Sequence, residues 1–175
     1  MNIFICCTSS KNVKSNYLEE AKKIGAFLAH NDYDLVMGGY NDTGIFSALI
    51  KEFKNRDINI YTLSIYDEDI PKYINYTYVN STYDRTKMCF DNSDKILILP
   101  GGTGTFSEIF GMLEEIRTYK IDKEIIIFNL DNYYVDLIKL INSSIKNEYN
   151  NKNILDYFKV FNTSDDLINY LGGRV

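Results

Sequence analysis

The chain has no tryptophan, two prolines, one histidine and three cysteines among its 175 residues. His30 has no cysteine or histidine near it in sequence, and no Cys-x-x-Cys pair is present, so the ligand spacings of a zinc site are missing. Cys6, Cys7 and Cys89 are an odd number of thiols, which argues against a disulfide framework. These absences predict reduced cysteines in a cytoplasmic protein that holds no metal.

The chain also lacks a long apolar run and a basic N-terminal segment. A membrane span needs about 20 consecutive apolar residues, and a secretory signal begins with basic ones, so neither is expected. The net charge of −5 argues against general nucleic-acid binding. With 45% hydrophobic and 25% charged residues, residues 1–175 are predicted to form one globular domain.

Short apolar runs alternate with segments of helical periodicity along the chain. Strands are expected at 3–7, 34–37, 58–65, 95–99, 124–128 and 157–161. Helices are expected at 17–30, 44–55, 84–92, 105–119, 133–146 and 164–171. Residues 66–82 are predicted to be irregular and to cover the surface. The alternation predicts an α/β fold: a Rossmann-like, doubly wound, mostly parallel sheet flanked by helices in a single domain.

The strongest motif is a glycine-rich loop directly after the apolar run 95–99 and just before a predicted helix. Glycines let backbone N–H groups crowd around an anion, and a helix N-terminus adds partial positive charge. Three glycines in four residues exceed what a simple turn requires, and neither a Walker A nor a GxGxxG pattern is present. The motif predicts a phosphate site made by Gly101, Gly102, Thr103, Gly104 and Thr105.

Two charged side chains accompany the loop. Glu108 follows it by one helical turn, and Arg85 lies in the preceding predicted helix. Glu108 could simply complement the helix dipole, and Arg85 could be a solvated helix residue. Alternatively, the Arg85 guanidinium could bind the phosphate or hold Glu108 ionised and oriented. Spacing alone does not decide whether the two side chains meet.

Polar or glycine-rich segments also follow the first two predicted strands. Ligands of parallel sheets bind beyond the carboxyl ends of the strands. Ser9, Ser10, Gly38 and Gly39 are therefore candidate nucleotide contacts, although such residues also serve as ordinary turns and helix caps. A tyrosine-rich stretch could stack on a base, or could pack in the protein or against another subunit: Tyr73, Tyr76, Tyr78 and Tyr83.

Together these motifs resemble the Lonely Guy family, also called lysine decarboxylase-like. The family's hallmark is Pro-Gly-Gly-x-Gly-Thr-x-x-Glu, and residues 100–108 match every fixed position. Arg85 matches the arginine that the family has in the helix before this strand. Residues 7–10 and 129–134 resemble the family's Cys-Gly-Ser-Ser and Asn-x-Asp-Gly-Tyr-Tyr segments. Departures lie around the expected base and ribose pocket: Thr86 replaces a lysine, and Gly111 replaces a frequent glutamate.

The resemblance implies a nucleoside 5′-monophosphate phosphoribohydrolase, which splits the N-glycosidic bond into free base and ribose 5-phosphate. It implies catalytic roles for Arg85 and Glu108, no cofactor, and a homodimer. The lysine decarboxylase label implies pyridoxal phosphate, which nothing in the sequence supports. Two alternatives stay open: a nucleotide-binding sensor or carrier without turnover, and an enzyme that transfers a base between sugars.

Overall fold

The computed structural model describes residues 1–63 and 70–173. Within these residues, seven strands form one sheet in the order β4-β3-β2-β1-β5-β6-β7, and every neighbouring pair is parallel. The strands are β1 (Asn2–Cys6), β2 (Asp34–Gly38), β3 (Ile58–Leu63), β4 (Asn75–Val79), β5 (Lys95–Ile98), β6 (Ile125–Phe128) and β7 (Phe158–Phe161). The predicted α/β fold with a doubly wound parallel sheet is confirmed.

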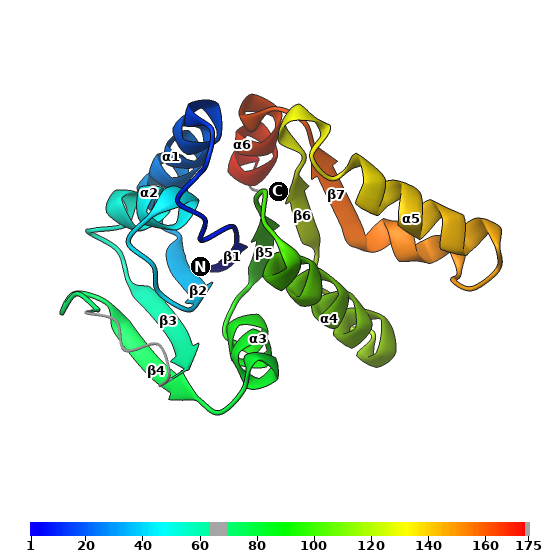
Figure 1. Ribbon diagram of the computed structural model, residues 1–175, viewed down its shortest axis with the longest axis horizontal. Helices are drawn as coiled ribbons and strands as arrows, with labels where there is room; N and C mark the ends of the chain where they lie inside the picture. Colours follow the sequence, from blue (N-terminus) through cyan, green and yellow to red (C-terminus); the bar gives the residue numbers. More distant parts are fainter. Residues whose placement is uncertain (64–69, 174–175) are drawn as a thin grey trace.

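The helices cover both faces of the sheet (Figure 1). They are α1 (Ser15–His30), α2 (Gly44–Glu52), α3 (Thr82–Asp91), α4 (Thr103–Tyr119), α5 (Val135–Lys146) and α6 (Ser164–Gly172), with 3-10 turns η1 (Leu130–Asn132) and η2 (Lys152–Tyr157). Because successive strand residues point to opposite faces, Ile3 and Ile5 pack under α1, α2 and α6, whereas Phe4 and Cys6 pack under α3, α4 and α5. In this part of the chain, no helix has the length and apolar character needed to cross a membrane.

The order of the strands fixes where a ligand can bind. The chain runs outward from β1 to β4 on one side, then crosses back to β5 and runs outward to β7 on the other (Figure 1). Connections therefore leave the carboxyl ends of β1 and β5 in opposite directions. Such a switch point opens a crevice at that edge of the sheet. The predicted phosphate loop follows β5 at this edge.

The prediction of irregular structure across residues 66–82 is wrong for β4, which forms the edge of the sheet beside β3. Its sequence, Asn-Tyr-Thr-Tyr-Val, does alternate polar and aromatic side chains, but four of the five residues are exposed and the last is half-buried. The alternation therefore does not come from burial of one face, and these tyrosines were interpreted as part of a surface segment. The end of the third predicted strand and the start of this stretch, residues 64–69, lie outside the described residues.

The turn before α2 requires a glycine. Gly44 has φ +62°, and a Cβ there would lie 2.2 Å from the backbone oxygen of Ser10. We expect Gly44→Ala to lower the free energy of unfolding by about 2 kcal/mol or more, because backbone strain and a clash with main chain add. Urea denaturation followed by circular dichroism measures this loss.

Gly111 is the matched control for Gly44→Ala. It lies inside α4, and a Cβ there would meet no atom within 4 Å. Gly111→Ala should therefore raise the free energy of unfolding by about 0.5–1 kcal/mol, since alanine is the better helix former. Equal stabilities for Gly44→Ala and the parent would contradict the strain assigned to the turn.

Candidate functional site

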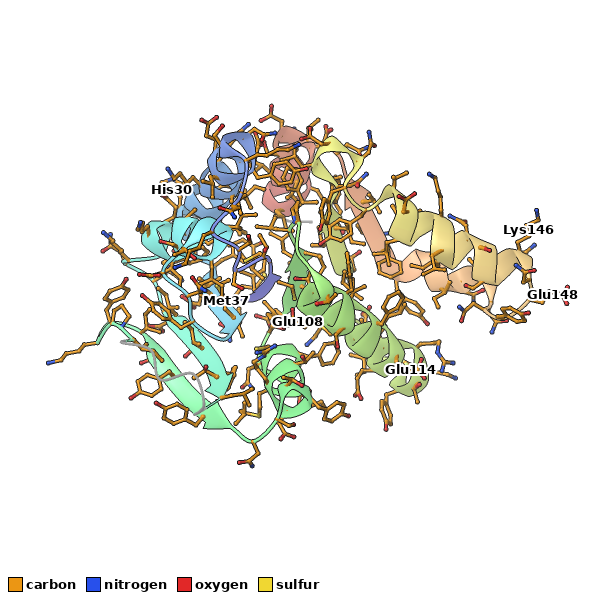
Figure 2. All side chains as sticks on the ribbon, in the orientation of Figure 1. His30, Met37, Glu108, Glu114, Lys146 and Glu148 are labelled. Carbon is orange, nitrogen blue, oxygen red and sulfur yellow. The ribbon has the colours of Figure 1, made fainter. Side chains whose placement is uncertain are left out.

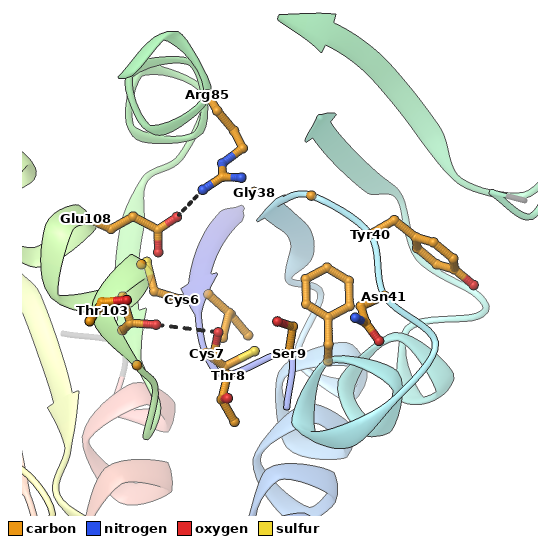
Figure 3. A pocket seen from close by; sticks show the side chains of 16 residues that line it. Cys6, Cys7, Thr8, Ser9, Gly38, Tyr40, Asn41, Arg85, Thr103 and Glu108 are labelled. Carbon is orange, nitrogen blue, oxygen red and sulfur yellow. Dashed lines mark hydrogen bonds and ion pairs between the residues drawn. The ribbon is translucent and has the colours of Figure 1, made fainter. Parts of the chain in front are cut away.

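A cavity of about 380 Å³ opens at the switch point of the sheet. Its walls come from the segments after β1 and β2, from α3, and from the loop that begins α4 (Figure 3). Most of the predicted site residues line it: Ser9, Gly38, Gly39, Arg85, Gly102, Thr103, Gly104, Thr105 and Glu108. The fold thus brings residues from four separate stretches of sequence to one place.

Ser10 and Gly101 do not line this cavity. They line a neighbouring one of about 330 Å³, which shares Thr8 and Gly102 with the first. Gly101 faces Thr105: a Cβ at Gly101 would lie 2.1 Å from Oγ1 of Thr105, so only glycine fits there. Gly101 therefore shapes the loop from behind, and the prediction of direct ligand contact does not follow from its position.

The loop ends in a helix N-terminus that has no side-chain cap. Gly102 is the N-cap of α4, so no side-chain oxygen accepts from the first N–H groups of the helix. Gly102 and Gly104 are exposed, and a Cβ at either would meet nothing within 4 Å. Thr105 ties the loop to the end of β1 by donating from Oγ1 to the carbonyl oxygen of Cys7, at 3.4 Å. These features leave open N–H groups toward the cavity, as an anion site requires.

Glu108 does not act as a first-turn helix glutamate. It lies beyond the first turn of α4, is only 8% exposed, and turns into the cavity (Figure 3). Figure 2 shows Glu114 on the same helix, away from Glu108; it is exposed and pairs with Arg117. Burial raises the pKa of Glu108 above its ordinary value, although the charge of Arg85 and a hydrogen bond from Cys6 act in the opposite direction.

Arg85 and Glu108 meet across the cavity wall. A terminal nitrogen of Arg85 lies 3.8 Å from Oε1 of Glu108, which is an ion pair beyond hydrogen-bond distance. Gly38 makes room for them, since a Cβ there would lie 3.2 Å from both Nε of Arg85 and Oε1 of Glu108. That Nε is buried and has no hydrogen-bond partner among the described residues. Buried polar groups without partners are rare and mark places where a ligand completes the bonding.

A second cavity of about 370 Å³ lies between α3 and α4 and shares a wall with the first cavity. It has Arg85, Thr103, Gly104 and Glu108 in common with the first, and Tyr83 also lines it. The other three tyrosines of the predicted stacking stretch are exposed and line neither cavity, and Tyr76 packs edge-on against Tyr78 with their ring centroids 5.4 Å apart. The structure thus places one of these tyrosines, Tyr83, on a cavity that Arg85 and Glu108 also line.

Several residues of the first cavity were not among the predicted ones. Cys6 ends β1 beside Glu108 and Cys7 follows it, and both were interpreted as buried thiols because they lie inside an apolar run. Tyr40 and Asn41 directly follow the predicted glycines, and Phe46 packs edge-on against Tyr40 with their ring centroids 6.3 Å apart. The adjacency of Tyr40 to Gly39 was a signal that could have identified this wall.

Comparison with known families decides the classification. The family model described as "Possible lysine decarboxylase" matches residues 41–171, which include the glycine-rich loop, Arg85 and Glu108. The chain belongs to this family. The resemblance to the Lonely Guy proteins, drawn from the hallmark motif, is thereby confirmed.

The chain also resembles individual proteins of known name. A probable cytokinin riboside 5′-monophosphate phosphoribohydrolase of Oryza sativa subsp. japonica is 25% identical over 151 residues, which are 84% of this chain and 60% of the rice protein. A cytokinin riboside 5′-monophosphate phosphoribohydrolase of Arabidopsis thaliana is 24% identical over 173 residues, 97% of this chain and 80% of the plant protein.

Solved structures share the fold over nearly the whole chain. The molybdenum cofactor carrier protein of Chlamydomonas reinhardtii superposes with a TM-score of 0.73 at 15% identity, and covers 98% of this chain and 95% of its own. The molybdenum cofactor binding protein of Rippkaea orientalis gives 0.66 at 13% identity, with 98% and 93% coverage. At these identities the likeness concerns the fold alone.

Proposed function

We propose that this protein hydrolyses the N-glycosidic bond of a nucleoside 5′-monophosphate to free base and ribose 5-phosphate. One observation carries the proposal: a desolvated carboxylate, Glu108, lies one turn beyond an uncapped helix N-terminus, and both face the same cavity. That spacing suits a ribose held by its 5′-phosphate at the loop, with its C1′ turned to the carboxylate.

Catalysis in this arrangement is mostly positioning and charge. The amides at the start of α4 hold the phosphate, which fixes the ribose over Glu108. As the bond from C1′ to the base nitrogen breaks, its electron pair leaves with the base and positive charge grows on the ribose. The Glu108 carboxylate stabilises that charge or activates the attacking water. Water gives its oxygen to C1′ and one proton replaces the sugar on the base.

Arg85 has two tasks in this scheme. Its terminal nitrogen faces Oε1 of Glu108 at 3.8 Å, so its charge favours the ionised carboxylate that the reaction requires. Its Nε, without a hydrogen-bond partner in the described residues, is free to donate to an oxygen of the bound ribose. Binding of substrate would then satisfy a donor that is otherwise buried at a cost.

The names of the plant relatives support the reaction, and the fold supports one rival. The rice and Arabidopsis proteins are named phosphoribohydrolases, at 24–26% identity. The molybdenum cofactor carrier protein of Chlamydomonas reinhardtii and the molybdenum cofactor binding protein of Rippkaea orientalis have the same fold without that reaction in their names. The rival function is therefore a carrier that binds a nucleotide or nucleotide-like cofactor in the same cavity and releases it unchanged.

The test is incubation of the purified protein with AMP, CMP, GMP and UMP, followed by chromatography for free base and ribose 5-phosphate. Release of both products in equal amounts from at least one nucleotide supports hydrolysis. Calorimetry on the same samples separates the rival, because tight binding of a nucleotide that is recovered intact would identify a carrier. Light scattering on the same protein tests the homodimer that the family resemblance implies.

Gly38 offers a mild disturbance of the ion pair. A methyl group at this position would lie 3.2 Å from Arg85 Nε and Glu108 Oε1, so one of the two must move by a few tenths of an ångström. Misplacement of catalytic groups by fractions of an ångström to 1 Å costs roughly 10- to 100-fold in rate. We expect Gly38→Ala to lower kcat for base release by about 10-fold.

Tyr119→Ala is the control for this variant, because Tyr119 is exposed at the far end of α4 and lines neither cavity, so its replacement leaves the ion pair in place. Steady-state kinetics of both variants on the preferred nucleotide give the comparison. Unchanged kcat in Gly38→Ala would show that the pair does not need its observed geometry.

A further inference from the structure

We propose that Cys6 is a positioning residue for Glu108: its thiol donates a hydrogen bond that holds the carboxylate, in its ionised form, toward the cavity. The inference rests on the proposed function of the same site. It concerns a residue that the sequence presented as part of the core. Three observations carry it: the direction of the Cys6 side chain, the state of its sulfur, and the weakness of the other contacts of Glu108.

The end of β1 aims Cys6 at Glu108. Cys6 pairs with Ile98 in the parallel ladder of β1 and β5, so its side chain shares the face covered by α3 and α4. Figure 3 shows this side chain pointing to the carboxylate from the side away from Arg85. The thiol and the carboxylate lie side by side on the first cavity, and the thiol acts to lower the pKa of Glu108. Glu108 is thus held between a cation on one side and a thiol on the other.

The sulfur of Cys6 remains a donor. Burial raises the pKa of the Cys6 thiol well above its ordinary value, and the negative charge of Glu108 raises it further. The proton therefore stays on sulfur throughout the physiological pH range, and the S–H group has one ionised oxygen to donate to. A thiol is also small and largely apolar, so it fits the cluster around Phe4 and Ile98 better than a hydroxyl would.

The other groups that face Glu108 do not duplicate this bond. On α3, Arg85 contributes its charge at 3.8 Å, beyond hydrogen-bond distance, and Cys89 interacts through charge without a hydrogen bond. Directly after β1, Cys7 likewise interacts through charge alone. From β2, Gly38 presents no side chain. Among the described residues, Cys6 is therefore the side chain placed to restrain the direction of the carboxylate.

The experiment compares the pH dependence of kcat/KM for base release in the parent, Cys6→Ala and Cys6→Ser. Loss of the donor destabilises the ionised carboxylate and raises the pKa of Glu108, so activity should be lost at a higher pH on acidification. The acid limb of Cys6→Ala should move up by about 0.5–1 pH unit, with roughly 3- to 10-fold lower kcat/KM on that limb. Cys6→Ser should restore the position of the limb, because its hydroxyl donates in place of the thiol.

Cys89→Ala is the matched control, since Cys89 is as buried as Cys6 and feels the charge of Glu108 but does not hydrogen-bond it. Its acid limb should coincide with that of the parent. Coincident limbs for Cys6→Ala and the parent, or an equal shift in Cys89→Ala, would overturn the proposal and leave Cys6 a packing residue. If Cys6→Ala does not fold, Cys6→Val fills the same space without a donor and serves instead.

A second readout separates this proposal from the proposed function. Carbon-13 NMR of protein labelled at glutamate side-chain carboxyls follows the titration of Glu108 directly, and Glu108→Gln identifies its signal. A parent protein that releases no base would refute the hydrolase function. The same titration, compared between the parent and Cys6→Ala, would still show whether the thiol sets the pKa of the carboxyl.

Discussion

Glu108→Gln is expected to lower kcat for base release by about 10³-fold while the protein stays folded. Glutamine keeps the shape of the side chain but removes the negative charge that faces the developing positive charge on the ribose. Loss of a single, preorganised electrostatic group in an active site costs roughly 10²- to 10³-fold in kcat, and a carboxylate that also activates water would lie at the upper end. Single-turnover assays on the preferred nucleotide measure the loss.

Glu114→Gln is the matched control on the same helix. Glu114 is exposed, and hydrogen bonds from Arg117 and Thr118 lower its pKa, so its charge is solvated and remote from the cavity. Its replacement should leave kcat within about 2-fold, as surface changes generally do. A Glu108→Gln enzyme with full activity, or equal losses in both variants, would end the assignment of Glu108.

The raised pKa of Glu108 adds a pH signature to this prediction. A carboxyl whose pKa is higher in the folded than in the unfolded protein stabilises the fold below its unfolded pKa, and that contribution is lost as the pH rises through the folded pKa. The Glu108→Gln variant has no carboxyl at this position, so its stability does not fall in this way. In thermal melts, the melting temperature of the variant relative to that of the parent should therefore rise from acid to neutral pH. The activity of the parent should rise over the same pH range, because its carboxylate ionises.

The sequence predicted the strands and helices well wherever burial leaves a regular pattern or a continuous run of apolar residues. Residues 96–99 and 125–128 are buried on both faces of the sheet, so they are apolar throughout and read as strands. The edge strand β4 is exposed on both faces and has no such apolar run. Edge strands are held by backbone hydrogen bonds to one neighbour, and such bonds leave no trace in side-chain composition.

The sequence indicated which strand ends form the site, but not how its side chains are oriented toward one another. The loop motif and the crossover rule together place Gly102, Thr105 and Glu108 near the ends of other strands. Whether Arg85 turns toward Glu108 depends on the packing of α3 against α4, and this is set by residues spread over both helices. The contact of Cys6 with Glu108 depends on the register between β1 and β5, which a single apolar run does not specify.

A nucleoside without its 5′-phosphate should be a poor substrate, with kcat/KM lower by roughly 10³-fold than that of the matching nucleotide. The phosphate binds the open N–H groups at the start of α4, away from the reacting bond, and its binding energy holds C1′ over Glu108. Loss of the phosphate therefore lowers kcat as well as affinity. Adenosine and AMP, assayed side by side for release of adenine, give the comparison.

A charge placed at the same helix end should remove most of this preference for AMP over adenosine. Thr103 is an exposed residue of the first turn of α4, so Thr103→Glu would put a carboxylate where the phosphate binds and lower kcat/KM for AMP by roughly 100-fold, with adenosine little affected. Tyr119→Glu adds the same charge at the far end of α4, where the side chain is exposed, and should leave the ratio of AMP to adenosine unchanged. Equal rates for AMP and adenosine in the parent would mean that the glycine-rich loop holds no phosphate. Glu108 would then have no anchored ribose to act on, and the mechanism would fail at its first step.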